Sequence, residues 1–293
     1  MSKELYVYID GKYLTKSEAK ISVYDHGLLY GDGVFEGIRA YNNKVLKLEE
    51  HVNRIFASAK AIDLQIPISK KEMIAVVVNT YSKNNRPNGY SRLVVTRGFG
   101  DLGLNPLKCK VASVICIVDD ISMYPQEMYD NGMPIITASQ RRNKAVCLDP
   151  QIKSLNYLNN IMARIEANRA GVSEALMLTS DGIVTECTGD NIFIVKDGVV
   201  YTPPIHVGIL EGITRNLVME LAIKNGIKVV EKEFTLYNLY NADECFLTGT
   251  AAEVISVTKV DERVIGAGVA GEISKKLLAV FHEYVRENGT PIK

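Results

Sequence analysis

Hydrophobic positions in the first 118 residues repeat with two different periods. A period of two predicts β-strands, and a period of three to four predicts helices with one buried face. The expected elements are a hairpin in residues 5–24, helices in 48–62 and 69–84, and strands in 90–97 and 111–118. Strands with two helices on one side predict an α+β domain. Residues 119–133 contain a proline and few patterned positions, so we expect a linker there.

The remaining residues are expected to form a larger second domain. The same two periods predict strands at 134–138, 175–179, 183–186, 191–195, 199–202, 227–233, 244–248 and 253–258, and helices at 213–225 and 271–287. A further helix is expected after Pro150, with a buried face made by Leu155, Leu158, Ile161, Met162 and Ile165. Lys153 would then lie at the buried start of that helix.

Lys153 is the first candidate for chemistry. Taking an ammonium out of water costs several kcal/mol unless the group is paired or deprotonated. A lysine at a buried helix start is therefore either a reactive amine or a side chain that extends to solvent, and most lysines take the second course. Its position alone does not decide between the two.

Composition favours small-molecule chemistry. The 293 residues include 34 Lys and Arg and 34 Asp and Glu, so the formal net charge is zero. Such a balance gives no broad basic surface for nucleic acid or an anionic membrane. The longest apolar run, Val111 to Val118, is too short to span a bilayer, and the N-terminus lacks a secretory signal pattern. We expect a cytoplasmic protein with neither nucleic acid nor membrane as a partner.

The metal-binding residue types are dispersed along the chain. Five cysteines and four histidines occur without a Cys-x-x-Cys pair or a histidine ladder. This spacing predicts reduced thiols and no metal site.

Two turns of small residues are candidates for binding a phosphate. Residues 210–215 open a helix with Gly212 and Thr214, and free amides, a hydroxyl and the helix dipole together suit an anion. Ordinary capping explains such a start about as often. Residues 248–252 form a second turn of this kind after a strand, and with Arg54 the two turns could hold one phosphate monoester.

Three further features each have two readings. Glu186 ends a short strand, where it is either a solvated side chain or the partner of a protonated ring nitrogen. Gly37 leaves a gap between Phe35 and Arg39 that could accommodate a ligand. The loop at residues 98–106 is either a lid or a plain connection between strands.

Five motifs in a fixed order carry a family resemblance. They are Phe35-Glu36-Gly37-Ile38-Arg39, Lys153-Ser154-Leu155-Asn156, Glu186 with Asp190-Asn191-Ile192-Phe193, Gly212-Ile213-Thr214-Arg215, and Gly249-Thr250-Ala251-Ala252-Glu253. In this order the chain resembles the fold-type IV pyridoxal-phosphate enzymes over residues 5–285, and most of all a branched-chain amino acid aminotransferase.

The resemblance implies a two-domain α+β fold of the D-amino acid aminotransferase-like type. A small α/β sandwich domain would occupy residues 1–118 and a linker residues 119–133. A larger domain with a β-barrel-like sheet and flanking helices would occupy residues 134–293 and carry the cofactor lysine.

The resemblance also implies a role for each site residue. Lys153 would hold pyridoxal 5'-phosphate as a Schiff base and move the proton, Glu186 would bind the pyridine nitrogen, and Tyr157 would bind the ring's 3-oxygen. The implied phosphate ligands are Arg54, Gly212, Ile213, Thr214, Gly249 and Thr250. The implied substrate residues are Phe35, Gly37, Arg39, Tyr90, Arg92, Tyr124, Thr250, Ala251 and Ala252, together with Tyr30 of the partner subunit.

The implied reaction is transamination of L-leucine, L-isoleucine and L-valine with 2-oxoglutarate. It gives branched 2-oxo acids and L-glutamate, and the reverse is the biosynthetic step. The implied assembly is a homo-oligomer, with a dimer as the minimum and a hexamer as a larger form. The short Ser154-Leu155 spacer also occurs in D-amino acid transaminases, which are the main alternative. An aminodeoxychorismate lyase and a non-enzymatic cofactor-binding protein are the others.

Overall fold

The chain divides into two compact units in the computed structural model, which describes residues 4–121 and 124–292. Unit 1 takes in the chain up to Ile121, the segment Ile152–Asn156 and the residues from Val285 onward. Unit 2 takes in the rest, 122–151 and 157–284. Residues 1–3, 122–123 and 293, which fall in the predicted first domain, linker and second domain, lie outside the described residues.

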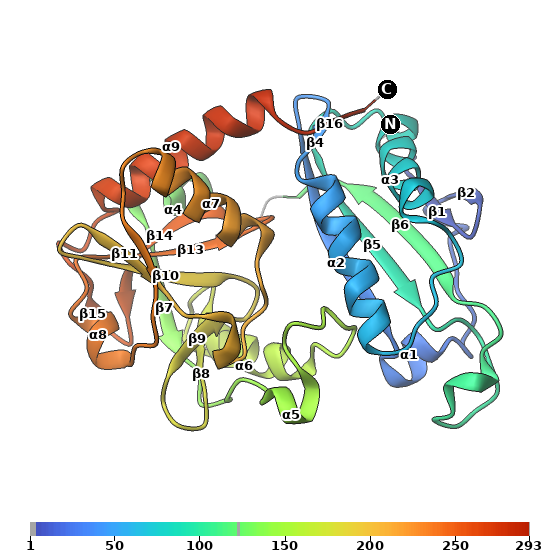
Figure 1. The fold of residues 1–293 in the computed structure, drawn as a ribbon, viewed down its shortest axis with the longest axis horizontal. Helices are drawn as coiled ribbons and strands as arrows, with labels where there is room; N and C mark the ends of the chain where they lie inside the picture. The colour runs from blue at the N-terminus through green and yellow to red at the C-terminus, as the bar shows by residue number, and fades with distance from the viewer. Residues whose placement is uncertain (1–3, 122–123, 293) are drawn as a thin grey trace. The chain divides into compact units, whose positions relative to one another are not determined.

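Unit 1 is a seven-stranded antiparallel sheet with two helices on one face (Figure 1). The strand order is β16-β4-β3-β5-β6-β1-β2. The strands are β1 Tyr6–Ile9, β2 Lys12–Thr15, β3 Gly33–Tyr41, β4 Lys44–Val45, β5 Gly89–Thr96, β6 Ser113–Asp119 and β16 Thr290–Pro291, and the helical segments are α1 His26–Tyr30, α2 Leu48–Ala61, α3 Lys70–Asn84 and the 3₁₀ turn η1 Pro106–Lys108. The predicted hairpin and both long helices are confirmed.

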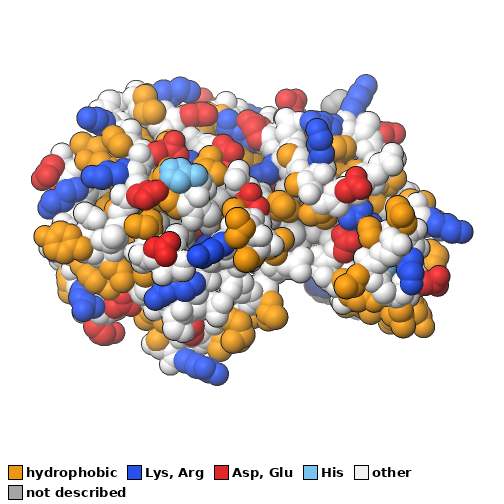
Figure 2. Space-filling model, turned by 60° about the horizontal axis from the view of Figure 1, so that its bottom comes forward, with side chains coloured by type: hydrophobic (Ala, Val, Ile, Leu, Met, Phe, Trp, Pro, Cys, Tyr) orange, Lys and Arg blue, Asp and Glu red, His pale blue; other side chains and the backbone are white. Residues whose placement is uncertain are grey.

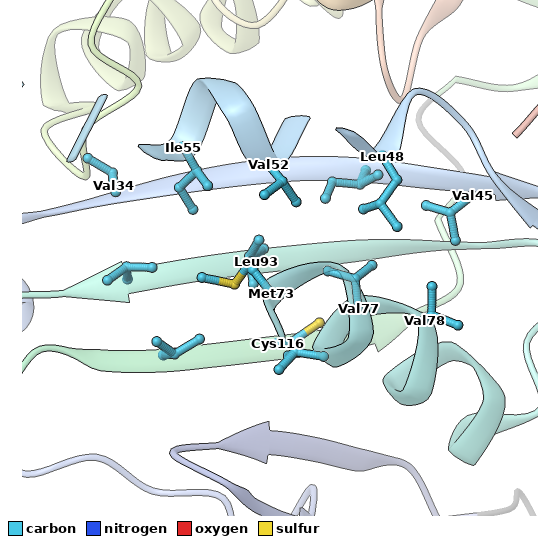
Figure 3. Packing of buried hydrophobic residues seen from close by; sticks show 14 of the residues in the cluster. Val34, Val45, Leu48, Val52, Ile55, Met73, Val77, Val78, Leu93 and Cys116 are labelled. Carbon is cyan, nitrogen blue, oxygen red and sulfur yellow. The ribbon is translucent and has the colours of Figure 1, made fainter. Parts of the chain in front are cut away.

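The core of unit 1 lies between helices α2 and α3 and the sheet. Figure 3 shows Val52 and Ile55 of α2 pointing toward Leu93 of β5, with Met73 of α3 beside them. These side chains are almost wholly buried, so their contacts fix both helices on the sheet. The opposite face of strand β3 carries Phe35, Gly37 and Arg39, whose side chains do not belong to this core.

Unit 2 is built on a closed barrel. Strands β10, β13, β14, β7, β8 and β9 follow one another, and β9 also pairs with β10, which closes the ring. The strands are β7 Met133–Thr137, β8 Ala175–Leu178, β9 Val184–Cys187, β10 Asn191–Lys196, β11 Val199–Thr202, β12 Val229–Glu231, β13 Glu244–Gly249, β14 Glu253–Val260 and β15 Arg263–Val264, and the helices are α4 Gln126–Asn131, α5 Ala145–Leu148, α6 Leu158–Arg169, α7 Ile213–Lys224, α8 Leu236–Tyr240 and α9 Glu272–Glu287, with the 3₁₀ turn η2 Ile205–Val207. The predicted barrel-like sheet is confirmed.

The domain boundaries differ from those expected at 118 and 134. The segment Ile152–Asn156 and the last residues of the chain belong to unit 1, because each pairs with a strand of its sheet. Helix α4 lies inside the expected linker. The predicted division into consecutive ranges misses these two segments, in which the chain comes back to unit 1.

The helix after Pro150 begins later than predicted, and it buries a different face. Helix α6 starts at Leu158, so Lys153 lies in extended chain before it. The predicted inward residues Leu158, Ile161 and Met162 are exposed. The buried residues are Asn160, Ala163 and Ala167, and the two alanines pack in one cluster with residues of β8. Small side chains let the helix approach the barrel closely, while its larger apolar side chains face outward.

Charge on the surface is mixed. On the face drawn in Figure 2, Lys and Arg side chains alternate with Asp and Glu, and no single sign gathers into a broad patch. Within the described residues, no helix has the length and apolar character to span a membrane.

Candidate active site

The predicted site residues fall into two groups, one in each unit. Unit 1 carries Tyr30, Phe35, Gly37, Arg39, Arg54, Tyr90, Arg92 and Lys153, and unit 2 carries Tyr124, Tyr157, Glu186, Gly212, Ile213, Thr214, Gly249, Thr250, Ala251 and Ala252. Each group is described by itself.

Lys153 is held against the start of strand β3. Its carbonyl accepts a hydrogen bond from the Phe35 amide at 3.0 Å, and its own amide donates to Ser58 Oγ at 3.2 Å. The Leu155 amide donates to the Gly33 carbonyl at 2.9 Å. These backbone bonds make the segment a short extra strand beside β3. They fix the Lys153 backbone independently of helix α6.

The Lys153 amine lies over an aromatic ring of the same sheet. Its Nζ is 4.7 Å from the centre of the Phe35 ring, and the Arg92 guanidinium is 4.5 Å from the same ring. Phe35, Gly37 and Arg39 alternate along β3 on the face opposite α2, as the period of two predicted. The sheet thus gathers an amine, an aromatic ring and a guanidinium on one face.

The predicted gap over Gly37 is filled by a tyrosine hydroxyl. A Cβ built on Gly37 would lie 2.0 Å from the Tyr90 Oη, and Gly37 pairs with Arg92 across the strands. The space that glycine leaves is therefore occupied by another predicted substrate residue. Two residues assigned separately from the sequence are in contact.

Arg54 is anchored by a buried carboxylate. Glu36 is fully buried, and its Oε1 accepts from Arg54 Nε at 2.7 Å. Its Oε2 accepts from Arg54 Nη2 at 2.8 Å and lies 2.7 Å from His51 Nδ1. Burial would raise the pKa of Glu36, but the Arg54 charge and hydrogen bonds outweigh it and hold the pKa well below 4.5. Burial also lowers the pKa of His51, which favours the neutral ring.

Tyr30 is tied to the loop that the sequence identified as a lid or a connection. The Tyr30 hydroxyl accepts from the Gly103 amide at 2.8 Å, and the His26 ring packs edge-on at 5.0 Å. Phe99, Leu102 and Leu107 of this loop and of η1 are exposed. The loop and helix α1 are thus joined through Tyr30, and both expose apolar side chains.

Glu186 is fixed by three donors in unit 2. Arg142 Nη2 donates at 2.6 Å, Asn191 Nδ2 at 2.9 Å, and the Leu210 amide lies 3.1–3.2 Å from both oxygens. Glu186 is 5% exposed, so its negative charge lies in a largely dry setting, where attraction to a protonated nitrogen is strong. Its burial excludes the reading in which Glu186 is a solvated side chain, and its role toward a ring nitrogen stays a prediction.

The start of helix α7 lies next to this carboxylate. Asn191 Nδ2 also donates to the Leu210 carbonyl at 3.0 Å, and a Cβ on Gly212 would lie 2.0 Å from Asn191 Oδ1. Gly212 caps the helix without a side-chain hydrogen bond. The first amides of α7, which include Ile213 and the buried Thr214, thus lie close to Glu186 and suit an anion.

The second small-residue turn belongs to the hairpin of β13 and β14. Gly249 pairs with Glu253, so Thr250, Ala251 and Ala252 form the connecting loop. Thr248 pairs with Asn191 across the strands, and its Oγ1 is buried without a hydrogen-bond partner among the described residues. An unpartnered hydroxyl beside Asn191 marks a position where a polar ligand atom fits.

Unit 2 therefore presents the donor set that a phosphorylated pyridine requires. A carboxylate with fixed orientation, an open helix N-terminus and an unpartnered buried hydroxyl are joined through Asn191. Tyr157 stands at the residue before α6 and accepts the Ile161 amide on its carbonyl. Pyridoxal phosphate fits this set chemically.

Sequence reasoning gave no role to the residues that orient the site. Glu36 shares a face of β3 with the buried Val34 and Ile38, and a charged residue in such an alternation predicts a buried partner. That signal was available for Glu36. Arg142 follows another arginine in an irregular segment, and nothing in the sequence pattern singles it out.

Comparison with known proteins gives a consistent family. The family model for amino-transferase class IV matches residues 33–260. A Methanocaldococcus jannaschii protein provisionally named branched-chain-amino-acid aminotransferase is 53% identical over 277 residues, covering 94% of this chain and 95% of that protein. A D-alanine aminotransferase of Bacillus licheniformis is 37% identical over 278 residues, covering 92% of this chain and 94% of that one.

A solved structure is similar over nearly the whole chain. It is the branched-chain amino acid aminotransferase of T.th. with pyridoxamine 5'-phosphate. It is 38% identical with a TM-score of 0.93, and the match covers 97% of this chain and 95% of that one.

Proposed function

Because the chain belongs to the class IV aminotransferases, we propose that it transfers the amino group between L-leucine, L-isoleucine or L-valine and 2-oxoglutarate. The cofactor is pyridoxal 5'-phosphate. The observation that carries the assignment to this chemistry is the Glu186 carboxylate, fixed by Arg142 and Asn191 beside the open start of α7. The 53% identical relative named for branched-chain substrates supports the substrate class.

Lys153 is the base and acid of the proposed reaction. Its Nζ would take the proton from the substrate's α-carbon and then deliver a proton to the cofactor. Lys153 would thus act first as a base and then as an acid. When bound, the cofactor supplies an electron-withdrawing ring that accepts the developing negative charge. Glu186 would keep the ring nitrogen protonated, and its three donors keep the carboxylate in one orientation.

The phosphate would be held by Arg54, Thr250 and the first amides of α7. Gly212 and Gly249 allow close approach of backbone there, because a Cβ on either would meet a neighbouring side-chain oxygen. Glu36 would set the direction of the Arg54 guanidinium through two parallel hydrogen bonds.

The sheet face of unit 1 suits two kinds of substrate. The Phe35 ring offers apolar surface for a branched side chain, and Arg92 beside it offers a cation for the second carboxylate of glutamate. Arg39, Tyr90 and the Thr250 to Ala252 loop would complete the substrate contacts. A site of this type accepts an apolar donor and an acidic acceptor in turn.

A D-amino acid transaminase is the second candidate. The short Ser154-Leu155 spacer and the 37% identical D-alanine aminotransferase favour it. A half-reaction distinguishes the two: the yellow holoenzyme is mixed with L-leucine, D-alanine or D-glutamate, and the visible absorbance is followed. We expect bleaching with L-leucine and recovery with 2-oxoglutarate. Bleaching with the D-amino acids alone would establish the second candidate instead.

Replacement of the lysine tests the chemistry itself. We expect Lys153→Ala to lose the yellow absorbance and nearly all turnover, because no other amine is assigned to the proton transfer. Lys144→Ala changes an exposed lysine that is not among the proposed site residues, so it is the matched control and should keep both. Substantial turnover in Lys153→Ala would refute the assignment.

We also propose a dimer with the site completed by Tyr30 of the partner subunit. The surface that we call the α1–loop patch supports a self-association face, because its apolar side chains are exposed. Its members are Val23, Tyr24, Leu28, Leu29, Phe99, Leu102, Leu104 and Leu107.

The five cysteines are free thiols, which supports a reducing, cytoplasmic location.

A further inference from the structure

A buried acidic group in unit 2 lies beside Tyr124, which is assigned to the substrate, and beside Gly249, which is assigned to the phosphate. Tyr124 Oη lies 3.2 Å from Asp190 Oδ2, and a Cβ built on Gly249 would lie 1.9 Å from Asp190 Oδ1. Asp190 is 4% exposed and Tyr124 is 5% exposed. One carboxyl group thus joins the Tyr124 hydroxyl to the turn that carries Thr250.

The protonation of Asp190 decides what the Tyr124 hydroxyl can do. A tyrosine hydroxyl has one proton to donate. If Asp190 is ionised, Tyr124 must donate that proton to it and can offer a substrate only lone pairs. If Asp190 is protonated, it can donate to the Tyr124 oxygen, and the Tyr124 proton is then available for an anionic ligand.

We propose that Asp190 is a positioning residue for the substrate carboxylate: it holds a proton, donates it to the Tyr124 oxygen, and so directs the Tyr124 hydroxyl proton to the substrate. The inference rests on the proposed function, since every substrate of that reaction carries a carboxylate. A neutral Asp190 also removes a negative charge from directly beneath the Gly249 turn. An ionised one would repel the anions assigned there.

The neighbouring groups favour a proton on Asp190 rather than on Glu174. Glu174, the other buried acid of this cluster, accepts from the Thr188 amide and hydroxyl and from the Ala175 amide, and Arg164 lies 3.8 Å away. These contacts stabilise an ionised Glu174. In the described part of the chain, the Tyr124 hydroxyl is the one side-chain group within hydrogen-bond distance of the Asp190 carboxyl.

Burial, and then the Glu174 charge, raise the pKa of Asp190 to about 7. Burial raises the pKa of Glu174 as well, but the contacts with Thr188, Ala175 and Arg164 oppose that rise. The titratable and charged groups that face Asp190 are Glu174, Tyr124, Arg164, Glu186 and Cys187. Burial raises the pKa of Tyr124 as well, so the phenol stays neutral throughout.

The test measures binding of a carboxylate that cannot react. The holoenzyme is titrated with 4-methylvalerate, which has a branched body and no amino group, from about pH 6 to about pH 9, where it stays ionised. We expect the Kd to rise about tenfold as Asp190 ionises, which corresponds to a one-unit shift of its pKa on binding. In Asp190→Asn, whose amide can donate to Tyr124 at every pH, this component should vanish.

The contribution of other titrating groups to the Kd is removed by comparing Asp190→Asn with the wild type at each pH. An equal pH dependence in Asp190→Asn and the wild type would overturn the proposal. Tyr124→Phe should bind more weakly at the acidic end, because it lacks the hydroxyl. Normal binding there would also overturn it.

An infrared measurement on the wild type tests the proposal even if Asp190→Asn does not fold. A protonated carboxyl band should be present at pH 6 and disappear near the pKa, and Glu174→Gln should shift its loss to lower pH, because a repelling charge is gone. Absence of the band would overturn the proposal. Failure of the proposed function is distinct, because L-leucine would then leave the wild-type absorbance unchanged.

Discussion

A single carboxylate, Glu36, orients two side chains of helix α2 from inside the core of unit 1. It is fully buried, and its oxygens are shared between Arg54 and His51. A charge in this position is stable only while its partners remain, since an unpaired buried ion is costly. Stability and ligand orientation therefore depend on the same three residues.

Removing Glu36 should destabilise unit 1. We expect Glu36→Ala to lower the free energy of unfolding by about 3–5 kcal/mol, because Arg54 loses its buried counter-charge. Because the pKa of Glu36 is depressed, its contribution is present above the unfolded value of 4.5 and is lost as pH falls. Urea unfolding at several pH values, followed by circular dichroism, measures both effects.

Glu50→Ala is the matched control for this experiment. Glu50 lies on the same helix and pairs with Lys47 at 3.1 Å, but its side chain is 47% exposed. Loss of such a surface pair should cost less than about 1 kcal/mol. Equal costs for the two variants would contradict the role of Glu36.

At the scale of elements, the N-terminus of α7 is shaped by glycine. Gly212 precedes the helix with φ of −69°, so the residue is required for space rather than for an unusual backbone angle. The space is taken by Asn191, which also holds Glu186. The anion site and the carboxylate are therefore coupled through one amide side chain.

A methyl group at position 212 should disturb both sites at once. We expect Gly212→Ala to weaken pyridoxal-phosphate binding at least about tenfold, because its Cβ would displace Asn191. Glu220→Ala is the control, because it changes an exposed position of the same helix. Gly226→Ala would not serve, because its φ of +75° makes any side chain strained. Cofactor titration by absorbance measures the difference. Unchanged affinity in Gly212→Ala would contradict the coupling of the anion site to Glu186 through Asn191.

The elements themselves were largely predictable, because periods of two and of three to four are local properties. Sequence reasoning failed at residues 152–165, where one apolar run crosses an extended segment and a helix. An outward apolar face such as that of Leu158 and Ile161 has the same pattern as an inward one. The proposed site residues come from the motifs, whereas Arg142, which donates to Glu186, had no local signal in the sequence.

At the scale of the whole molecule, the α1–loop patch should determine the assembly. We expect Leu107→Glu to convert the proposed dimer to a monomer and to lower activity, since Tyr30 of the partner subunit would be lost from the proposed site. Leu107 is 87% exposed, so the change should not disturb the fold of one subunit. Light scattering after gel filtration measures the mass.

Ile223→Glu is the control for this change. Ile223 is an exposed apolar residue of α7, outside the patch, and 61% of it is accessible. This variant should remain dimeric and active. If Leu107→Glu also stays dimeric, the patch is not the interface.

The returns of the chain to unit 1 set an order for its biosynthesis. Strand β16 pairs with β4, and the Lys44 ammonium donates to the Glu287 carbonyl at 2.8 Å. The sheet that contains β1 thus gains β16 only after the strands and helices of unit 2 have been synthesised. Until then the nascent chain carries a sheet with an open edge at β4, whose unpaired backbone groups can pair with another chain.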